Sequence, residues 1–153
     1  MAAGVLSSEA YGIKSTAADM IRYVRANMNL VKVDGKLQRA IANTHKGYFK
    51  AGVMTQDLIW EQYSYPVELK TLLEGNSPEM IFDPSPVTEI RPPQTPLEND
   101  WINKTGSTNG FGAYVAFVPA EHLGIVILAN TSFPIEDRVT VAYKLIRSLV
   151  EIR

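Results

Sequence analysis

The run Leu123–Ala129 restricts the fold of this chain more than any other feature, because none of its residues has a polar side chain. It is far shorter than the ~20 residues that a membrane-spanning helix needs, and its valine and isoleucines favour a strand. A strand with no polar face has to be covered on both sides. We therefore expect this strand to lie in a sheet that has other layers packed against both faces.

Further strands surround this run in the sequence. Phe111–Val118 is predicted to be a strand, and Pro119–His122 is predicted to join it to the apolar run as a hairpin loop. Trp101–Thr105, just before the hairpin, and Leu58–Tyr63 have the pattern of two shorter strands. The sequence therefore predicts three or four antiparallel strands.

Three segments have apolar residues at helical spacing. The first is predicted to begin near Thr16, an N-cap with Asp19 three residues later. The second is predicted over Leu37–Ala51 and is followed by Gly52, a suitable residue after a helix C-terminus. The third follows Pro134 and has a single apolar face, so it can cover only one side of a sheet. Strands and helices in separate parts of the chain give the α+β fold class.

The prolines are unevenly distributed along the chain. None of the nine prolines precedes Pro66, and seven fall between Pro66 and Pro96. We expect the segment over residues 66–98 to be a long irregular excursion, and loops of this length in compact domains are often functional.

Composition excludes several classes of protein. Of the 153 residues 46% are hydrophobic and 20% are charged, which is typical of a globular domain. Lys and Arg number 15 against 16 Asp and Glu, so the net charge of -1 argues against nucleic acid as a partner. The chain has no cysteine, which excludes disulfides and Cys-ligated zinc. Its two histidines lack metal-site spacing, so we expect no metal and no cofactor. The first residues do not have the pattern of a signal peptide.

One short motif, Lys104-Thr105-Gly106, suggests chemistry. A lysine at the end of an inner strand places a positive charge where a carboxylate or a developing anion can lie. The glycine lets the backbone of a ligand lie along the strand edge, and the N–H of Ser107 is a candidate donor for an oxyanion hole. The alternative is a solvent-facing lysine before a glycine turn, because a tripeptide is a weak signal by itself.

The wider context resembles a known family. The residues Trp101–Pro119, Leu123–Asn130 and Glu9–Thr16 are similar to the C-terminal part of class C (AmpC-type) serine β-lactamases. The resemblance runs from about Gly4 to the last helix. It implies that residues 1–153 form the C-terminal portion of such a domain, with helices over about 16–51, the Pro-rich loop over 66–98, and strands and a helix over 101–153.

The resemblance implies roles for particular residues. Lys104, Thr105 and Gly106 match the family's K-T-G motif, in which the lysine joins the catalytic hydrogen-bond network and the strand binds the substrate amide. Ser107 matches the position whose N–H completes the oxyanion hole.

Two further residues are implied to bind substrate. Tyr11 matches a tyrosine that lines the substrate pocket, although it could instead be a hydrophobic staple before the first helix. Arg138 matches an arginine near the substrate carboxylate, although it could instead be a surface arginine. Ile135 departs from the asparagine of several members, so a direct amide contact with the substrate acid is lost. The stretch over about 80–96 matches the loop beside the substrate's leaving group.

The family's other catalytic motifs are absent from these residues. No serine has a lysine three residues later, and no tyrosine has an asparagine two residues later. The S-x-x-K nucleophile and the Y-x-N tyrosine belong to the N-terminal part of the family sequence. The antiparallel sheet should therefore be incomplete, with a bare edge and a bare face.

Two classes of function remain open. In the first, the chain is part of an enzyme that hydrolyses penicillins and cephalosporins through an acyl-enzyme, inactive alone and completed by the N-terminal part. In the second, it is a non-catalytic module that associates with a second copy. A weak esterase with Ser107 as its nucleophile is a third, less favoured possibility. The resemblance implies a periplasmic location, and we expect a β-lactam substrate and no membrane partner.

Overall fold

A computed structural model describes residues 13–108 and 110–152. Its helices are α2 (Ala17–Asn27), α3 (Gly35–Thr44), α4 (Leu69–Gly75), α5 (Pro78–Phe82) and α6 (Ile135–Glu151), with a 3-10 turn η1 (Pro119–Glu121). Its strands are β1 (Gly47–Ala51), β2 (Met54–Gln56), β3 (Glu61–Ser64), β4 (Val87–Gln94), β5 (Asp100–Thr108), β6 (Phe111–Val118) and β7 (Leu123–Ala129). None of the described helices is both long enough and apolar enough to cross a membrane.

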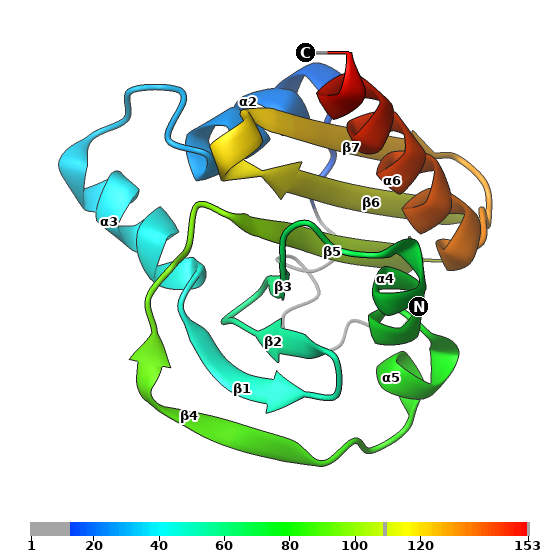
Figure 1. The fold of residues 1–153 in the computed structure, drawn as a ribbon. Coiled ribbons are helices and arrows are strands. Elements are labelled where there is room, and N and C mark those ends of the chain that lie inside the picture. Colours follow the sequence, from blue (N-terminus) through cyan, green and yellow to red (C-terminus); the bar gives the residue numbers. More distant parts are fainter. Residues whose placement is uncertain (1–12, 109, 153) are drawn as a thin grey trace.

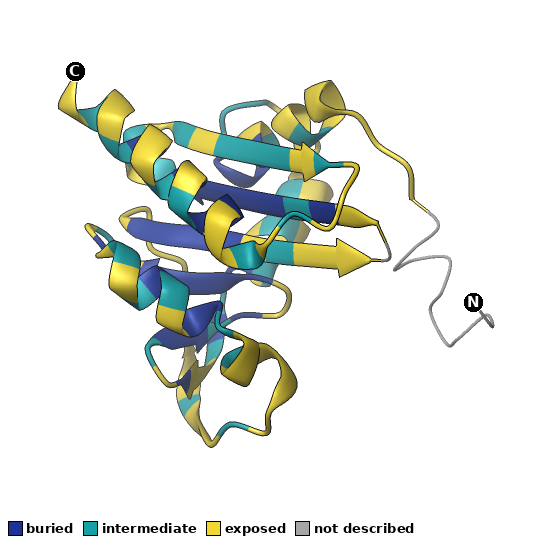
Figure 2. Cartoon of the chain, turned by 90° about the vertical axis from the view of Figure 1, so that its right-hand side faces the viewer, coloured by how far each residue is buried: buried dark blue, intermediate teal, exposed yellow. Residues whose placement is uncertain are grey.

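The strands form one antiparallel sheet in the order β4-β1-β2-β3-β5-β6-β7 (Figure 1). This confirms the predicted α+β class with helices beside an antiparallel sheet. The hairpin β6–β7 has its predicted place, and Val115 lies opposite Val126 at its centre. The sheet has seven strands rather than the predicted three or four. Buried residues are concentrated in its middle strands, and β4 at one edge is largely exposed (Figure 2).

Both faces of the β6–β7 end of the sheet are covered. Helix α6 packs on one face, and α2 packs on the other. Gly124 permits the second contact, because a Cβ atom at this position would come 2.7 Å from Cγ1 of Val24 in α2. The expectation of a bare face was therefore wrong, since the first helix of the chain supplies the missing layer. Its predicted start is confirmed, as the Thr16 side chain accepts a hydrogen bond from the Asp19 N–H.

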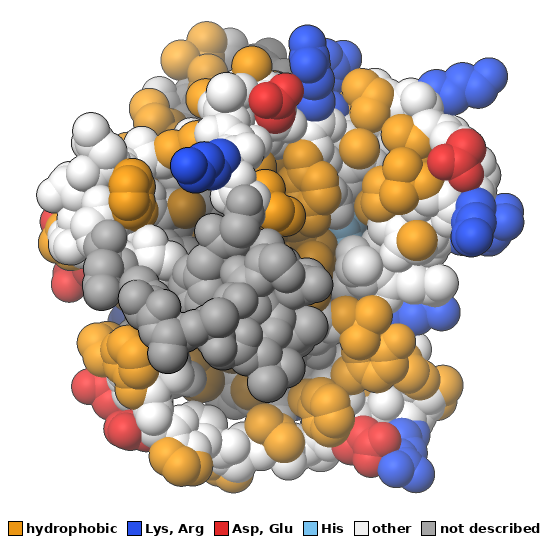
Figure 3. All heavy atoms as spheres, turned by 180° about the vertical axis from the view of Figure 1, so that it is seen from behind, with side chains coloured by type: hydrophobic (Ala, Val, Ile, Leu, Met, Phe, Trp, Pro, Cys, Tyr) orange, Lys and Arg blue, Asp and Glu red, His pale blue; other side chains and the backbone are white. Residues whose placement is uncertain are grey.

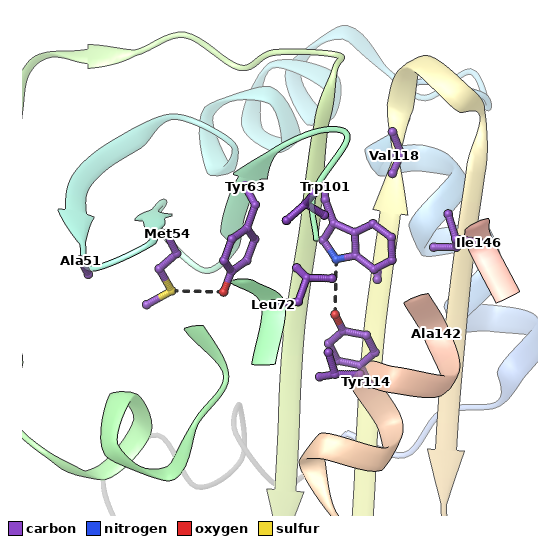
Figure 4. Close-up of a cluster of buried hydrophobic side chains, with 12 residues drawn as sticks. Ala51, Met54, Tyr63, Leu72, Trp101, Tyr114, Val118, Ala142 and Ile146 are labelled. Atoms are coloured by element: carbon purple, nitrogen blue, oxygen red, sulfur yellow. Dashed lines mark hydrogen bonds between the residues drawn. The ribbon is translucent and has the colours of Figure 1, made fainter. Parts of the chain in front are cut away.

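The larger core lies under α6 and α4 (Figure 4). Trp101 and Tyr114 are fully buried there, and the Trp101 Nε1–H donates to the Tyr114 hydroxyl over 3.4 Å. Gly75 at the end of α4 lies against the Tyr63 hydroxyl, so a larger residue would displace α4 from the sheet. A smaller core joins α2 to the opposite face of the sheet, the side seen in Figure 3.

The second helix was predicted too long. It ends at Thr44, and Gly47–Ala51 forms β1 between β2 and β4. Tertiary contacts decide this, because β2 and β3 lie so close to Gly47 that a Cβ atom there would come 2.5 Å from Thr55 Cγ2 and 2.9 Å from Gln62 Nε2. Gly52, expected to follow a helix, makes the β1–β2 turn with a φ of 55°.

Two other expectations were also wrong in detail. The strand expected over Leu58–Tyr63 begins only at Glu61, after a bend, and continues to Ser64. The Pro-rich segment is not irregular, because it contains α4, α5 and β4. Strand β4 tolerates Pro92 because it is an edge strand, where a missing N–H costs no ladder hydrogen bond.

Candidate functional site

The two halves of β5 have different neighbours. Asp100–Asn103 pair with β3 on one side, and Ile102–Thr108 pair with β6 on the other. From Lys104 onward no described strand pairs with the β3-side edge of β5. The side chains change accordingly, since Asp100–Asn103 are buried and most of Lys104–Thr108 are exposed. The K-T-G motif thus begins where the strand emerges from the sheet interior.

A groove of about 400 Å³ runs beside this half of β5. Lys104–Ser107 line one side of it, and the end of α4 with Met80–Phe82 of α5 lines the other. Four of the six predicted site residues therefore share one cavity. A free strand edge beside a groove can bind an extended amide-containing ligand by adding it to the sheet.

Lys104 has a fixed acidic neighbour. Its Nζ lies 2.7 Å from Oε1 of Glu61, the first residue of β3. The Lys104 side chain is 45% exposed, but that of Glu61 is only 11% exposed. The partly exposed ammonium group is therefore bound beside the groove by a carboxylate that is mostly buried.

Arg138 is a buried residue with extensive backbone contacts. Its Nη1 donates to the carbonyl oxygens of Gly106, over 2.7 Å, and Ala113, and its Nη2 donates to Ser107 Oγ over 2.9 Å. Nε lies 3.4 Å from the Pro134 carbonyl oxygen. The alternative of a surface arginine was therefore wrong. Burial lowers the pKa of Arg138, and four of its five N–H donors are engaged within the described residues.

A smaller cavity of about 200 Å³ adjoins Ser107 and Arg138. Phe111, Phe133 and Ile135 contribute apolar walls to it. Ile135 also lines the larger groove, so it stands at the junction of the two cavities.

Sequence reasoning missed the polar residues behind Lys104. Asn103 Nδ2 donates to Glu61 Oε2 over 3.0 Å, and the Tyr114 hydroxyl donates to Asn103 Oδ1 over 2.8 Å. Asn103 immediately precedes the motif, yet no spacing signal links either residue to Glu61, more than 40 residues earlier. Tyr11 lies outside the described residues. Within the described part of the chain, no three His, Asp or Glu side chains form a metal-binding group.

An antiparallel sheet covered by helices, with K-T-G on an inner strand beside a groove, is typical of the serine β-lactamases and penicillin-binding proteins. The β-lactamase family model matches residues 1–149. The chain belongs to the β-lactamase family.

Individual relatives agree with this assignment. A β-lactamase of Psychrobacter immobilis is 51% identical over 96% of this chain, and the match covers 37% of that relative. A β-lactamase of Pseudomonas fluorescens is 48% identical over 95% of this chain, and the match covers 41% of that relative. The D-alanine carboxypeptidase AmpC of Burkholderia cenocepacia is 57% identical, with a TM-score of 0.94 over 97% of this chain and 42% of its own. A class C β-lactamase in complex with cefoxitin is also 57% identical, with a TM-score of 0.91 over 97% of this chain and 41% of its own. The chain thus spans about two fifths of the length of these relatives.

Proposed function

We propose that this chain supplies the K-T-G strand to the active site of a class C β-lactamase that hydrolyses penicillins and cephalosporins. The observation that supports this most is the edge of Lys104–Ser107, which lines the groove and pairs with no described strand on its β3 side. The cefoxitin complex of a relative 57% identical to the chain supports a β-lactam as the ligand. A periplasmic location is proposed from the family resemblance alone.

The proposed reaction is an acyl transfer to a serine. The serine hydroxyl loses its proton as its oxygen attacks the β-lactam carbonyl carbon, the ring C–N bond breaks, and the ring nitrogen takes up a proton. Water then hydrolyses the ester, which releases the ring-opened acid and restores the serine hydroxyl. Neither the S-x-x-K serine nor the Y-x-N tyrosine occurs in the 153 residues, so the proposal assigns both to the N-terminal part of the enzyme.

In this scheme the chain binds and stabilises the reacting group. Lys104 carries positive charge beside the developing anion, and the Ser107 N–H is one donor of the oxyanion hole. Thr105 and Gly106 receive the substrate amide along β5. Arg138 lies behind this strand, and its one remaining N–H is the donor available to a substrate carboxylate. Tyr11 is proposed to line the pocket as in the family.

The alternatives receive less support. An esterase needs a base beside Ser107, but the hydroxyl accepts a hydrogen bond from Arg138, and a guanidinium cannot take up a proton. A non-catalytic module remains the main alternative.

Reconstitution distinguishes the two main proposals. The chain would be combined with the segment that precedes the matched region in a β-lactamase relative, carrying S-x-x-K and Y-x-N. We expect nitrocefin hydrolysis by the mixture and none by either part alone. A stable complex without hydrolysis would favour the non-catalytic module. Hydrolysis by the chain alone, or a penicillin adduct on it, would contradict the assignment of the nucleophile and would make Ser107 the first residue to replace.

A further inference from the structure

A chain of buried hydrogen bonds ends at the ammonium group of Lys104. Glu61 uses its two carboxylate oxygens for different partners: Oε1 contacts Lys104 Nζ at 2.7 Å, and Oε2 accepts from Asn103 Nδ2 at 3.0 Å. One oxygen thus faces the groove while the other is bound to a side chain of the interior. The second contact fixes the carboxylate independently of the first.

Asn103 is itself held from behind. Its side chain is fully buried, as is that of Tyr114, whose hydroxyl donates to Asn103 Oδ1 over 2.8 Å. Asn76 Nδ2 lies 3.4 Å from the same oxygen, and Trp101 Nε1–H donates to the Tyr114 hydroxyl. Two side chains therefore hold the amide oxygen of Asn103, and Trp101 holds one of them, Tyr114, from behind.

These contacts fix which end of the Asn103 amide faces Glu61. An amide has one acceptor oxygen and one donor nitrogen. Because the oxygen accepts from Tyr114, the NH₂ group points to the carboxylate. A flipped amide would set its carbonyl oxygen against Glu61 Oε2, where two acceptors would face each other. It would also turn its NH₂ group toward the Tyr114 hydroxyl, which already accepts from Trp101 Nε1–H. Tyr114 thus determines the direction of the hydrogen bond that orients Glu61.

An ion pair between two exposed side chains is too weak to hold a lysine in one conformation. Holding its side chain costs up to about 2 kcal/mol of rotamer entropy, whereas an exposed ion pair contributes only about 0.2–1 kcal/mol. An ion pair in which one partner is already fixed has only the lysine left to order. The burial of Glu61, at 11% side-chain exposure, provides that condition here.

We propose that Asn103 and Tyr114 are positioning residues for Lys104, and that they act through Glu61. Neither lines the groove; they orient the carboxylate that keeps the ammonium group at the start of β3. The significance for catalysis rests on the proposed function, but the positioning is a property of this chain alone.

Side-chain NMR tests this without a substrate. The order parameter of the Lys104 ε-methylene would be measured by ¹³C relaxation, with Lys36, an exposed lysine on α3, as the reference for a mobile side chain. We expect Lys104 to be clearly more ordered than Lys36 in the unmodified chain. Asn103→Ala should lower its order parameter to below about 0.6, the range of flexible groups. Tyr114→Phe, which keeps the ring in the core, should lower it by a smaller amount.

Asn99→Ala is the matched control, because Asn99 makes one exposed hydrogen bond to the Tyr65 carbonyl oxygen outside this network. It should leave Lys104 unchanged. If Asn103→Ala fails to fold, Tyr114→Phe decides the question. An unchanged Lys104 order parameter in the folded variants would overturn the proposal. Failed reconstitution of hydrolysis would count against the proposed function and leave this result standing.

Discussion

Arg138 Nη2 lies 2.9 Å from Ser107 Oγ and joins the first turn of α6 to the end of the K-T-G strand. The same guanidinium binds carbonyl oxygens of β5 and β6. It also fills the space above Gly112, where a Cβ atom would come 3.2 Å from Arg138 Cζ. Arg138 therefore supports the site in addition to any contact with substrate.

The first prediction follows from these contacts. Arg138→Met should lower the free energy of unfolding by at least about 2 kcal/mol, because the carbonyl oxygens of Gly106 and Ala113 each lose a part-buried hydrogen bond from a charged donor. Urea denaturation of the chain measures this. Arg147→Met is the control, since Arg147 makes an exposed ion pair with Glu151 that contributes at most about 0.5 kcal/mol. Equal losses in the two variants would contradict the structural role of Arg138.

The second prediction concerns Lys104 in the reconstituted enzyme. Lys104→Ala should lower kcat by about 100-fold or more, the scale for removing one electrostatic stabiliser. Lys104→Arg should not restore it, because a planar guanidinium does not replace a compact ammonium. Lys144→Ala, on the exposed side of α6, is the control. Turnover close to that of the unmodified enzyme in Lys104→Ala would remove Lys104 from the site.

The third prediction concerns pH. Asp57 is 4% exposed, and neither of its carboxylate oxygens has a hydrogen-bond partner among the described residues. Burial, with Asp100 and Glu61 nearby, raises its pKa to about 8. Asp100 is also buried, and its own pKa is raised to about 6, although Lys50 opposes this shift. Because the folded state holds the Asp57 proton more tightly than the unfolded state, its contribution to stability is complete below about pH 4 and is lost as the pH rises to 8.

Asp57→Asn removes that loss. The variant should match the unmodified chain at pH 4 and should have a higher urea midpoint at pH 8.5. Asp83→Asn, at an exposed position, should change the midpoint little at either pH. A midpoint for Asp57→Asn that is no higher than that of the unmodified chain at pH 8.5 would show that the Asp57 carboxylate is accommodated in its ionised form.

The fourth prediction concerns His45, which lies between Trp60 and Phe117. Burial lowers its pKa to about 4. Its Nε2 is 2.9 Å from Asn27 Oδ1, and Asn27 Nδ2 donates elsewhere, to the Tyr23 carbonyl oxygen. His45 should therefore be neutral at pH 6 with its proton on Nε2. Nitrogen NMR of the imidazole ring would show this, and a charged ring at pH 6 would contradict it.

The parts that the sequence predicted well are those governed by local pattern. Thr16 capped its helix as expected, and the unbroken apolar run became β7. The error at Gly47–Ala51 arose where partners distant in sequence decide the structure, because β1 is a strand only when β2 and β4 lie beside it. Lys104-Thr105-Gly106 was singled out by its motif and by the resemblance, and its role in the site stays a prediction. Glu61 was not singled out at all, nor was Asn103, since their contact depends on strand pairing that no spacing rule encodes.

The last prediction concerns association. The sequence predicts a chain that is not a stable monomer, because its sheet should have a bare face and a bare edge. The bare face was wrong, since α2 covers it. The bare edge remains, because no described strand pairs with the outer edge of β7, and its sequence has neither a charge nor a proline to prevent pairing.

Helix α6, which packs against β6 and β7, carries an exposed apolar surface of its own. Its residues Val141, Leu145 and Leu149 are 41%, 50% and 50% exposed and follow one another at four-residue spacing, so they form one stripe. An exposed apolar stripe on a helix and an unpaired strand edge each favour association with a second copy. We expect sedimentation at micromolar concentration to show a dimer or a larger species. Replacing Leu145 and Leu149 with Glu should shift it toward monomer, whereas Leu37→Glu on α3, 48% exposed, should not. A monodisperse monomer of the unmodified chain with a cooperative thermal transition would show that the free edge of β7 is tolerated in water.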